Sequence, residues 1–416
     1  MSAPRHVRPL DRGTSDAERP RLELGPLGFD GGAHVLVKLA LTECAGGTEV
    51  VVRGTHPELL ADLRAWCRQQ GHGCTPVGPD VGVAAVRRGR AAGARSVGAE
   101  RAGHAIATEP GAVVARPPPG WGLAPRGALV EPGGPAPDFR LADRDELWTE
   151  RAESFYEQAT ATQWDPAVAI DWSQPVVHGP AIERAVVQVM TFLVENEEAA
   201  LVVPARFLGQ VHPHFREVQQ VLAVTVADEA RHIEVFTRRA TMTGYGPALS
   251  TVGGRASLQS LVDEPDYATA MFLLSVMGEG TFLSLLGFLE RHAPDPVTRR
   301  VAQLTRRDEA RHVAFSMAHL ERHARLQPDL RARLARAVEH RHQALQQTSG
   351  LNDDVFDALV LLAAGEEDPA SIAHGWQRVQ DLQRDMAEAR QGRLVRLGFS
   401  PGEAETLSSL HTRNFM

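Results

Sequence analysis

The sequence predicts a small α+β unit at the N-terminus, joined by a linker to a large all-α region built as a four-helix bundle with extra helices. Three observations lead to this fold class. Short segments with strand and helix periodicity lie within residues 21–90, Gly, Ala and Pro dominate residues 91–138, and long helical patterns occupy residues 139–416. A chain of 416 residues has room for two or three domains.

The N-terminal unit follows a polar segment, residues 1–20, which is rich in Pro and Arg and which we expect to be disordered. Strands are predicted at residues 21–24, 49–53, 73–77 and 81–86, and helices at 33–44 and 56–70. Residues 91–138 include Pro117-Pro118-Pro119, and a composition of this kind cannot bury a core. They are therefore predicted to form a linker.

The remainder of the chain has helical periodicity throughout. Helices are predicted at about 140–160, 180–211, 214–245, 268–292 and 296–325, followed by further helices over about 329–410. The turn at His212-Pro213-His214 is predicted to lie on the surface. Trp164 and Trp172 are expected to pack against the bundle.

Composition restricts the classes of partner. The net charge of −8 excludes nucleic acid binding by bulk electrostatics. Cys44, Cys67 and Cys74 lack metal-site spacing, which favours a reduced cytoplasmic protein. The N-terminus has no apolar segment of signal-peptide type, and no apolar run is predicted to span a membrane.

The pentapeptide Asp-Glu-Ala-Arg-His occurs twice, at Asp228–His232 and at Asp308–His312. Each copy contains Glu-x-x-His, and residues three apart on a helix share one face, so a carboxylate and an imidazole can bind the same metal ion. Four-helix carboxylate metal sites use this pair from two helices and one further Glu from each of the other two. The repeat therefore predicts two more ligand glutamates.

One of these glutamates is Glu279, which lies in the very apolar segment 271–289. A carboxylate on such a surface is costly to bury unless it is paired, so Glu279 is predicted to face the metal site.

The helix before the first motif offers Glu195, Glu197 and Glu198. Glu197 continues an apolar stripe that includes Met190, Leu193 and Ala200, and so points inward. Spacing instead favours Glu198, because the separation between Glu198 and Glu229 is closer to the separation between Glu279 and Glu309 in the second half of the repeat. We prefer Glu197, because one additional loop residue changes the spacing freely.

The predicted ligand set is therefore Glu197, Glu229, His232, Glu279, Glu309 and His312. Four carboxylates balance the charge of two divalent cations, and an oxygen-rich set with two imidazoles suits iron or manganese. Asp228 and Asp308 are placed to bond a histidine ring nitrogen, with Arg231 and Arg311 near enough to neutralise them.

This constellation resembles the ferritin-like superfamily of non-haem di-iron carboxylate proteins. Within that superfamily it resembles the oxygen-activating branch, which includes bacterial multicomponent monooxygenases, p-aminobenzoate N-oxygenase-like enzymes and the small subunits of ribonucleotide reductase. The resemblance implies that the six residues bind two iron ions, with manganese as an alternative, and that dioxygen is a co-substrate.

At two positions this chain departs from members of the oxygen-activating branch, which limits the functions that the resemblance implies. Reductase small subunits carry a radical tyrosine four residues after the first ligand histidine, where this chain has Phe236. The N-oxygenases have a third histidine four residues before the second ligand glutamate, where this chain has Thr305. The tyrosyl-radical function is therefore excluded, and N-oxygenation does not follow from the resemblance. Thr225 and Thr305 each lie one turn before a predicted ligand glutamate, at the same offset in both repeats. They are expected either to pack between helices or to contact bound oxygen or water.

The N-terminal unit resembles the TusA/SirA sulfur-carrier fold, with the best match from His56-Pro57-Glu58 to Gly71-His72. The family carries its working cysteine at the start of the first helix, where this chain reads Gly31-Gly32-Ala33-His34. Persulfide carriage by that cysteine is excluded. The resemblance implies a docking or binding role, for a sulfur carrier, for another protein or for the chain's own bundle.

The function expected is that of a di-iron oxidase or oxygenase acting on a small organic substrate by hydroxylation, N-oxygenation or oxidative cleavage. Electrons must come from an external donor, because the sequence has no flavin or nicotinamide fingerprint. A homodimer is expected. Apolar side chains are expected to line the site, namely Phe192, Phe236, Phe282 and Phe315. The alternative is a non-catalytic iron-binding or ferroxidase-type ferritin-like protein.

Overall fold

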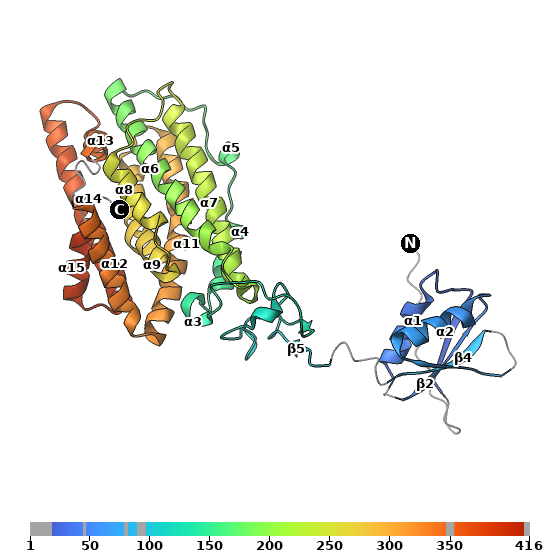
Figure 1. Cartoon of the computed structure of the whole chain (residues 1–416). Helices are drawn as coiled ribbons and strands as arrows, with labels where there is room; N and C mark the ends of the chain where they lie inside the picture. The colour runs from blue at the N-terminus through green and yellow to red at the C-terminus, as the bar shows by residue number, and fades with distance from the viewer. Residues whose placement is uncertain (1–18, 45–46, 79–81, 90–96, 347–352, 412–416) are drawn as a thin grey trace. The chain divides into compact units, whose positions relative to one another are not determined.

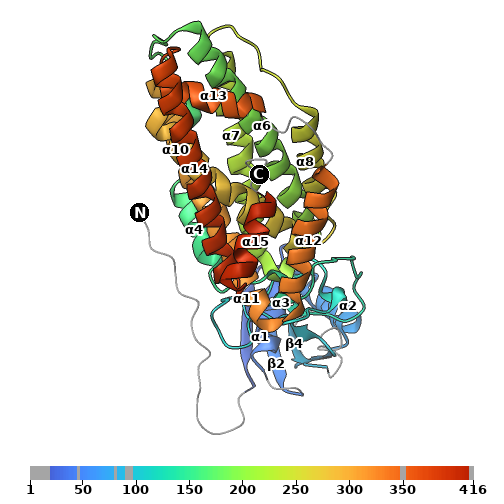
Figure 2. The ribbon, with the colours of Figure 1, turned by 90° about the vertical axis from the view of Figure 1, so that its left-hand side faces the viewer.

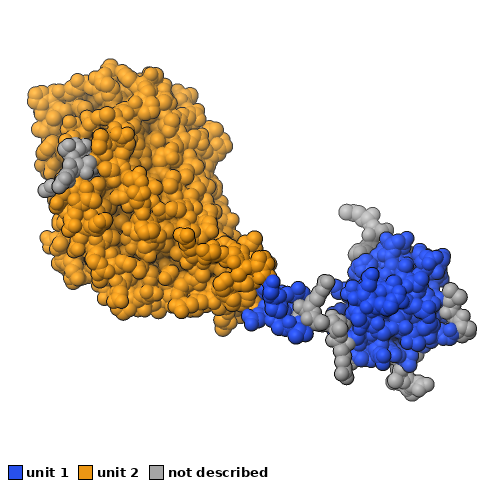
Figure 3. All heavy atoms as spheres, viewed as in Figure 1, with its two compact units in different colours: residues 1–100, 129–133 blue, residues 101–128, 134–416 orange. Residues whose placement is uncertain are grey.

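The computed structural model describes residues 19–44, 47–78, 82–89, 97–346 and 353–411. The chain divides into two compact units, one of residues 1–100 and 129–133 and the other of residues 101–128 and 134–416 (Figure 3). The predicted fold class, a small α+β unit and a helical bundle, is confirmed. The disorder expected for residues 1–20 falls almost entirely outside the described residues.

The first unit contains a four-stranded sheet in the order β1-β2-β4-β3, in which β1 and β2 are parallel and the other pairs antiparallel. Its elements are β1 Arg21–Gly25, α1 Ala33–Thr42, β2 Glu49–Gly54, α2 Leu59–Gln70, β3 Gly73–Pro76 and β4 Val83–Arg87. Buried positions recur every fourth residue along α2, at Leu59, Leu63 and Cys67. This spacing gives the helix one apolar stripe, which packs in a core with the strands.

The second unit is built on α6 Pro180–Leu208, α7 Arg216–Thr241, the continuous segment Tyr267–His292 and α11 Pro296–Leu326. Helix α6 packs along α7, and α10 along α11 (Figure 1). Shorter elements precede or connect these helices: η2 Pro119–Trp121, α3 Arg144–Leu147, α4 Ala152–Ala161, α5 Pro166–Ala169, η3 Pro213–Phe215 and α8 Val252–Val262. Two short strands, β5 Glu100–Arg101 and β6 Leu129–Val130, pair with each other. Helix α8 was not predicted from the sequence.

Four further helices complete the second unit: α12 Asp329–Leu345, α13 Asp353–Ala364, α14 Pro369–Arg396 and α15 Pro401–His411. Helix α14 packs against both α10 and α15, and α13 packs against α6 and α14 (Figure 2). These additional helices therefore cover faces of the bundle that would otherwise be exposed to solvent.

The segment Tyr267–His292 changes its winding along its length. It begins as α9 Tyr267–Met271, continues as a π-helix, η4 Phe272–Glu279, and ends as α10 Gly280–His292. Such π-helical insertions are rare and are frequent at functional sites, and this one ends at Glu279. Among the described residues, this is the one helix with the length and apolar composition to cross a membrane, but 89% of its most apolar window is buried inside the protein as a core helix.

Residues 101–128 were predicted as part of a linker, but they form a packed loop over the turn between α6 and α7. Ala112 is buried, and the guanidinium of Arg126 forms a buried ion pair with Glu217, with Nη1 to Oε2 at 2.8 Å. His214, predicted to lie on the surface with His212, is 2% exposed and accepts a hydrogen bond from the Val114 amide. Both predictions were wrong because tertiary contacts, made by Arg126 and by the Val114 amide, anchor a segment whose Gly- and Pro-rich sequence gives no local signal of packing.

Candidate metal centre

Helices α7 and α11 bring the two Glu-x-x-His pairs into the interior of the bundle. Glu229 and His232 are fully buried on α7, while Glu309 and His312 are at most 4% exposed on α11. The three-residue spacing puts both side chains of each pair on the same helix face, as the repeat predicts.

The two further glutamates come from the other helices of the bundle. Glu197 on α6 is 2% exposed, and Glu279 at the end of η4 is 4% exposed. Glu198, the alternative to Glu197, lies on the exposed face of α6. The structure therefore favours the choice made from the apolar stripe over the choice made from spacing.

The ligand atoms form two overlapping groups that share Glu229 and Glu309. One group consists of Glu197, Glu229, His232 and Glu309, and the other of Glu229, Glu279, Glu309 and His312. Within each group the candidate ligand atoms lie within 4.8 Å of one another. The buried cluster could therefore bind two metal ions, with Glu229 and Glu309 common to both groups.

Both imidazoles present Nδ1 to the carboxylates. Nδ1 of His232 lies 3.0 Å from Glu229 Oε2 and 3.2 Å from Glu309 Oε1. Nδ1 of His312 lies 2.9 Å from Glu229 Oε1 and 3.4 Å from Glu309 Oε2. Each histidine is thus close to both of the shared glutamates.

The orientation of these atoms tests whether the cluster fits metal ions. Buried atoms without a hydrogen-bond partner include Glu279 Oε2, both carboxylate oxygens of Glu309, and Nδ1 of His312. His312 Nδ1 lies close to Glu229 Oε1, yet the two are not aligned for a hydrogen bond. Buried polar atoms of this kind require a partner, and atoms that converge without bonding one another suit cations placed between them. The residues fit two metal ions.

The pKa shifts in the cluster also indicate that its buried carboxylates require nearby positive charge. Burial raises the pKa of Glu197 and of Glu279 well above the usual range, and repulsion from the shared glutamates raises both further. Burial lowers the pKa of His232 and His312, but the facing carboxylates more than offset it and raise both well above normal. Without metal the cluster therefore retains protons, which two cations would replace.

A second set of contacts orients the histidines and crosses between the two repeats. Nε2 of His232 lies 3.3 Å from Asp308 Oδ2, and Nε2 of His312 lies 3.2 Å from Asp228 Oδ2. The sequence predicted that these aspartates would bond a histidine, and the structure pairs each with the histidine of the other repeat. Contacts of this kind hold a ligand imidazole in one orientation.

Arg231 and Arg311 each contact both aspartates. Nη2 of Arg231 binds Asp228 and lies 3.2 Å from Asp308 Oδ2, and Nη2 of Arg311 lies 2.7 Å from Asp308 Oδ1 and 3.1 Å from Asp228 Oδ2. The two arginines and two aspartates thus form an ion-pair network in which the positive and negative charges balance.

The segment before α5 contributes two contacts that sequence analysis missed. Gln163 donates from Nε2 to Asp228 Oδ1 at 3.0 Å, and Trp164 donates from Nε1 to Asp308 Oδ2 at 2.6 Å. The guanidinium of Arg231 lies 4.7 Å from the centre of the Trp164 ring. The sequence predicted only packing for Trp164, because its contact with Asp308 depends on tertiary structure.

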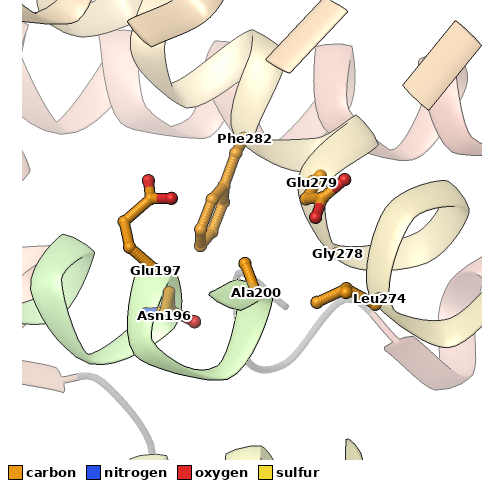
Figure 4. Close-up of a pocket in the computed structure, with 7 residues that line it drawn as sticks. All are labelled: Asn196, Glu197, Ala200, Leu274, Gly278, Glu279 and Phe282. Carbon is orange, nitrogen blue, oxygen red and sulfur yellow. The ribbon is translucent and has the colours of Figure 1, made fainter. Parts of the chain in front are cut away.

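A small cavity lies between Glu197 and Glu279, with Phe282 beside it (Figure 4). Its volume is about 10 Å³, which is room for about one water molecule. The rings of Phe192 and Phe282 pack edge to face at 5.9 Å. The phenylalanines expected to line the site are all buried, including Phe236 and Phe315. Thr305 is fully buried, and its hydroxyl has no hydrogen-bond partner among the described residues.

Residues 201–347 match the family described as p-aminobenzoate N-oxygenase AurF. The matched segment contains both Asp-Glu-Ala-Arg-His repeats and Glu279, while Glu197 lies just before it. The match supports an oxygen-dependent di-iron oxidase or oxygenase. Thr305 remains a departure from the third histidine that the resemblance to N-oxygenases leads one to expect.

Several solved structures resemble the helical region at low sequence identity. A Synechococcus protein with aldehyde deformylating oxidase activity is 18% identical, with a TM-score of 0.40, covering 55% of this chain and 96% of that protein. A variant of the R2-like ligand-binding oxidase with an Mn/Fe cofactor is 18% identical, with a TM-score of 0.49, covering 61% and 95%. Another variant of that oxidase, with an Fe/Fe cofactor, is 16% identical, with a TM-score of 0.48, covering 61% and 95%. No curated protein matches the chain.

Proposed function

We propose that this chain is an oxygen-dependent di-iron oxidase or oxygenase that acts on a small organic substrate. The observation that carries the proposal is the pair of buried ligand groups that share Glu229 and Glu309. Glu229 and Glu309, which belong to both groups, would bind both metal ions. Glu197 and His232 would complete one metal position, and Glu279 and His312 the other.

In this proposal each residue has a distinct task. A pair of redox-active iron ions, or of iron and manganese, supplies dioxygen activation when bound. Glu229 and Glu309 would contribute a carboxylate to each of the two metal positions. Asp308 and Asp228 hold the imidazoles of His232 and His312 in the orientation that presents Nδ1 inward. The apolar surroundings, with Phe282 beside Glu279, leave room for no more than about one water molecule at the site.

Substrate access requires movement of side chains. The cavity beside Glu279 holds about one water, so an organic substrate enters only if Phe282 or a neighbouring side chain changes position. Hydroxylation, N-oxygenation and oxidative cleavage all remain within the proposal, and the match to the N-oxygenase family supports the second.

The wider setting is also part of the proposal. The electrons come from an external reductase or small reductant, and the protein acts as a homodimer in the cytoplasm. Cys44, Cys67 and Cys74 are free thiols, in keeping with a reducing compartment.

For the N-terminal unit we propose a TusA-like docking role without sulfur carriage. Helix α1 begins at Ala33, and its N-cap is Gly32 with φ of 97°. The position at which the resemblance places the working cysteine is therefore a helix start without a thiol. A sulfur carrier or another protein is the partner proposed for this unit.

Metal analysis and oxygen consumption test the proposed function together. Protein reconstituted anaerobically with Fe(II) should contain about two iron ions per chain, as the two ligand groups require. With a reductant and a candidate aromatic amine or other small substrate, it should consume dioxygen and release an oxidised organic product. The iron-storage alternative would instead be supported by two results together. The protein would oxidise iron without forming an organic product from any of a broad panel of substrates, and it would assemble into a large hollow oligomer.

A further inference from the structure

A groove separate from the metal centre lies where α10 meets α11 and α14. Its volume is about 240 Å³, and one wall is the face of α10 that carries Gly280, Ser284 and Gly287. Arg306 from α11 and Arg393 from α14 also line the groove. No residue of this groove lines the cavity beside Glu279, so the two spaces are distinct.

The two glycines allow the arginines to lie directly against the helix. A Cβ atom at Gly280 would come within 2.5 Å of the Arg393 guanidinium carbon. A Cβ atom at Gly287 would come within 3.3 Å of the same atom of Arg306. The small-residue face of α10 therefore holds both guanidinium groups at the groove.

Arg393 is buried without an acidic partner. Its side chain is 8% exposed in total, and Nε donates to the Val276 carbonyl at 2.8 Å. Its Nη2 atom is buried and has no hydrogen-bond partner. Among the residues described in the structure, no carboxylate lies within ion-pair distance of it.

The surroundings add positive charge rather than neutralising it. Arg390, one turn before Arg393, is 1% exposed and binds neutral groups, the Ser408 carbonyl at 3.0 Å and the Thr281 hydroxyl at 3.1 Å. Burial and the positive charge of Arg393 together lower the pKa of Arg390 to about 9. A buried cation without a counter-charge is costly.

The acidic groups near the groove do not remove this imbalance. Glu290 pairs with Arg306 at 3.2 Å on the exposed side, and Asp385 is an exposed carboxylate at the rim. Arg291 adds a third arginine to the lining. Three arginines and one aspartate thus line the groove, and the buried Nη2 of Arg393 has no hydrogen-bond partner among the described residues.

We propose that this groove binds a small oxyanion, a carboxylate or a phosphate, held between Arg393 and Arg306 against the small-residue face of α10. A planar guanidinium offers paired N–H donors that match the oxygens of both anions, and the Ser284 hydroxyl lies on the same wall. The bound anion supplies the counter-charge that the buried arginines lack. This site does not depend on the metal ligands.

Calorimetric titration of the full-length, metal-loaded protein with inorganic phosphate, and separately with acetate, tests the proposal. One saturable site per chain is expected, together with a rise in melting temperature. Arg306→Met removes one guanidinium at an exposed position and should weaken binding about tenfold or more, since charge-assisted hydrogen bonds are among the strong ones. Arg393→Met should abolish binding. Arg299→Met, an exposed arginine of α11 outside the groove lining, is the matched control and should bind as the unaltered protein does.

The relative affinities identify the source of the oxyanion. Tighter phosphate binding indicates a phosphate ester as the natural ligand, and tighter acetate binding indicates an organic acid. Absence of saturable binding of either anion would overturn the proposal, and so would binding that is unchanged in Arg306→Met. Because Arg306 is exposed, this variant keeps the test decisive even if Arg393→Met fails to fold, which circular dichroism would reveal.

Discussion

Replacing one glutamate at a time should remove metal in a pattern set by which ligand group each glutamate belongs to. Glu309 belongs to both groups, Glu279 to one, and Glu198 to neither. Glu309→Ala should therefore disturb both metal positions, Glu279→Ala mainly one, and Glu198→Ala none. The last variant is a close control, because Glu198 adjoins Glu197 but is exposed.

The size of the effect can be expressed as thermal stability. Metal at a concentration about 100 times its Kd stabilises the folded state by about 2.7 kcal/mol per site. For a domain of this size about 1 kcal/mol corresponds to roughly 2–4 °C. Each occupied site should thus raise the melting temperature by roughly 5–10 °C, and two sites by about twice that. Most of this gain should vanish in Glu309→Ala, and about half in Glu279→Ala.

Elemental analysis and scanning calorimetry, with and without Fe(II) under nitrogen, measure both quantities on the same samples. Metal content should fall in the order Glu198→Ala, Glu279→Ala, Glu309→Ala. A Glu309→Ala protein that retained both metals, or a Glu198→Ala protein that lost one, would refute the ligand assignment. Equal losses in Glu279→Ala and Glu309→Ala would refute the bridging role alone.

Four further predictions concern other parts of the molecule. Asp308→Asn should weaken metal binding about 10- to 100-fold in a competitive chelator titration, with exposed Asp263→Asn as control; unchanged affinity would contradict an orienting role for Asp308. Burial raises the pKa values of Glu183 and Asp295, but hydrogen bonds, above all those from Arg239, outweigh burial and lower both pKa values. The stability that these two carboxylates contribute to the fold should therefore be present above about pH 4.5 and lost as the pH falls further. Arg239→Met should therefore cost about 3–5 kcal/mol in urea unfolding at pH 7 and less at pH 4; an equal cost at both would contradict this. Gly375→Ala should destabilise by about 1–3 kcal/mol, because its Cβ would lie 2.3 Å from the Val360 carbonyl oxygen, whereas Gly392→Ala, with open space, should stabilise by about 0.5–1 kcal/mol; equal effects in thermal melts would refute the packing argument. Finally, a hydrogen bond from Cys67 lowers the pKa of Cys74 to about 7, so limited iodoacetamide followed by peptide mapping should find Cys74 labelled before buried Cys44 and Cys67; earlier labelling of Cys44 would contradict it.

The parts of the fold that sequence predicted well are those governed by local periodicity. The strands and helices of the first unit and the four long helices of the bundle lie within a few residues of their predicted bounds. The apolar stripe also distinguished buried Glu197 from exposed Glu198, because the faces of a helix depend only on spacing along the chain.

Features that depend on contacts between distant segments were missed. The π-helix before Glu279 follows from packing and carries no local signal that composition would reveal. Arg126 and Glu217 pair across a segment that composition predicted to be a linker. The bond from Trp164 to Asp308 likewise joins residues far apart in the sequence.

The crossed pairing of the repeats explains why each carries an Asp and an Arg beside its ligands. Asp228 bonds His312 and Asp308 bonds His232, so neither histidine is oriented by its own helix alone. Both arginines contact both aspartates, which balances the charge of the aspartates whether or not metal is present. Glu197 and Glu279, whose pKa values are raised by burial and by repulsion from the shared glutamates, are then the carboxylates whose charge depends on metal. Each pentapeptide therefore supplies two candidate metal ligands, and also one Asp and one Arg of an ion-pair network. That network is complete only when α7 and α11 pack together. It follows that disrupting one repeat should impair the metal site of the other.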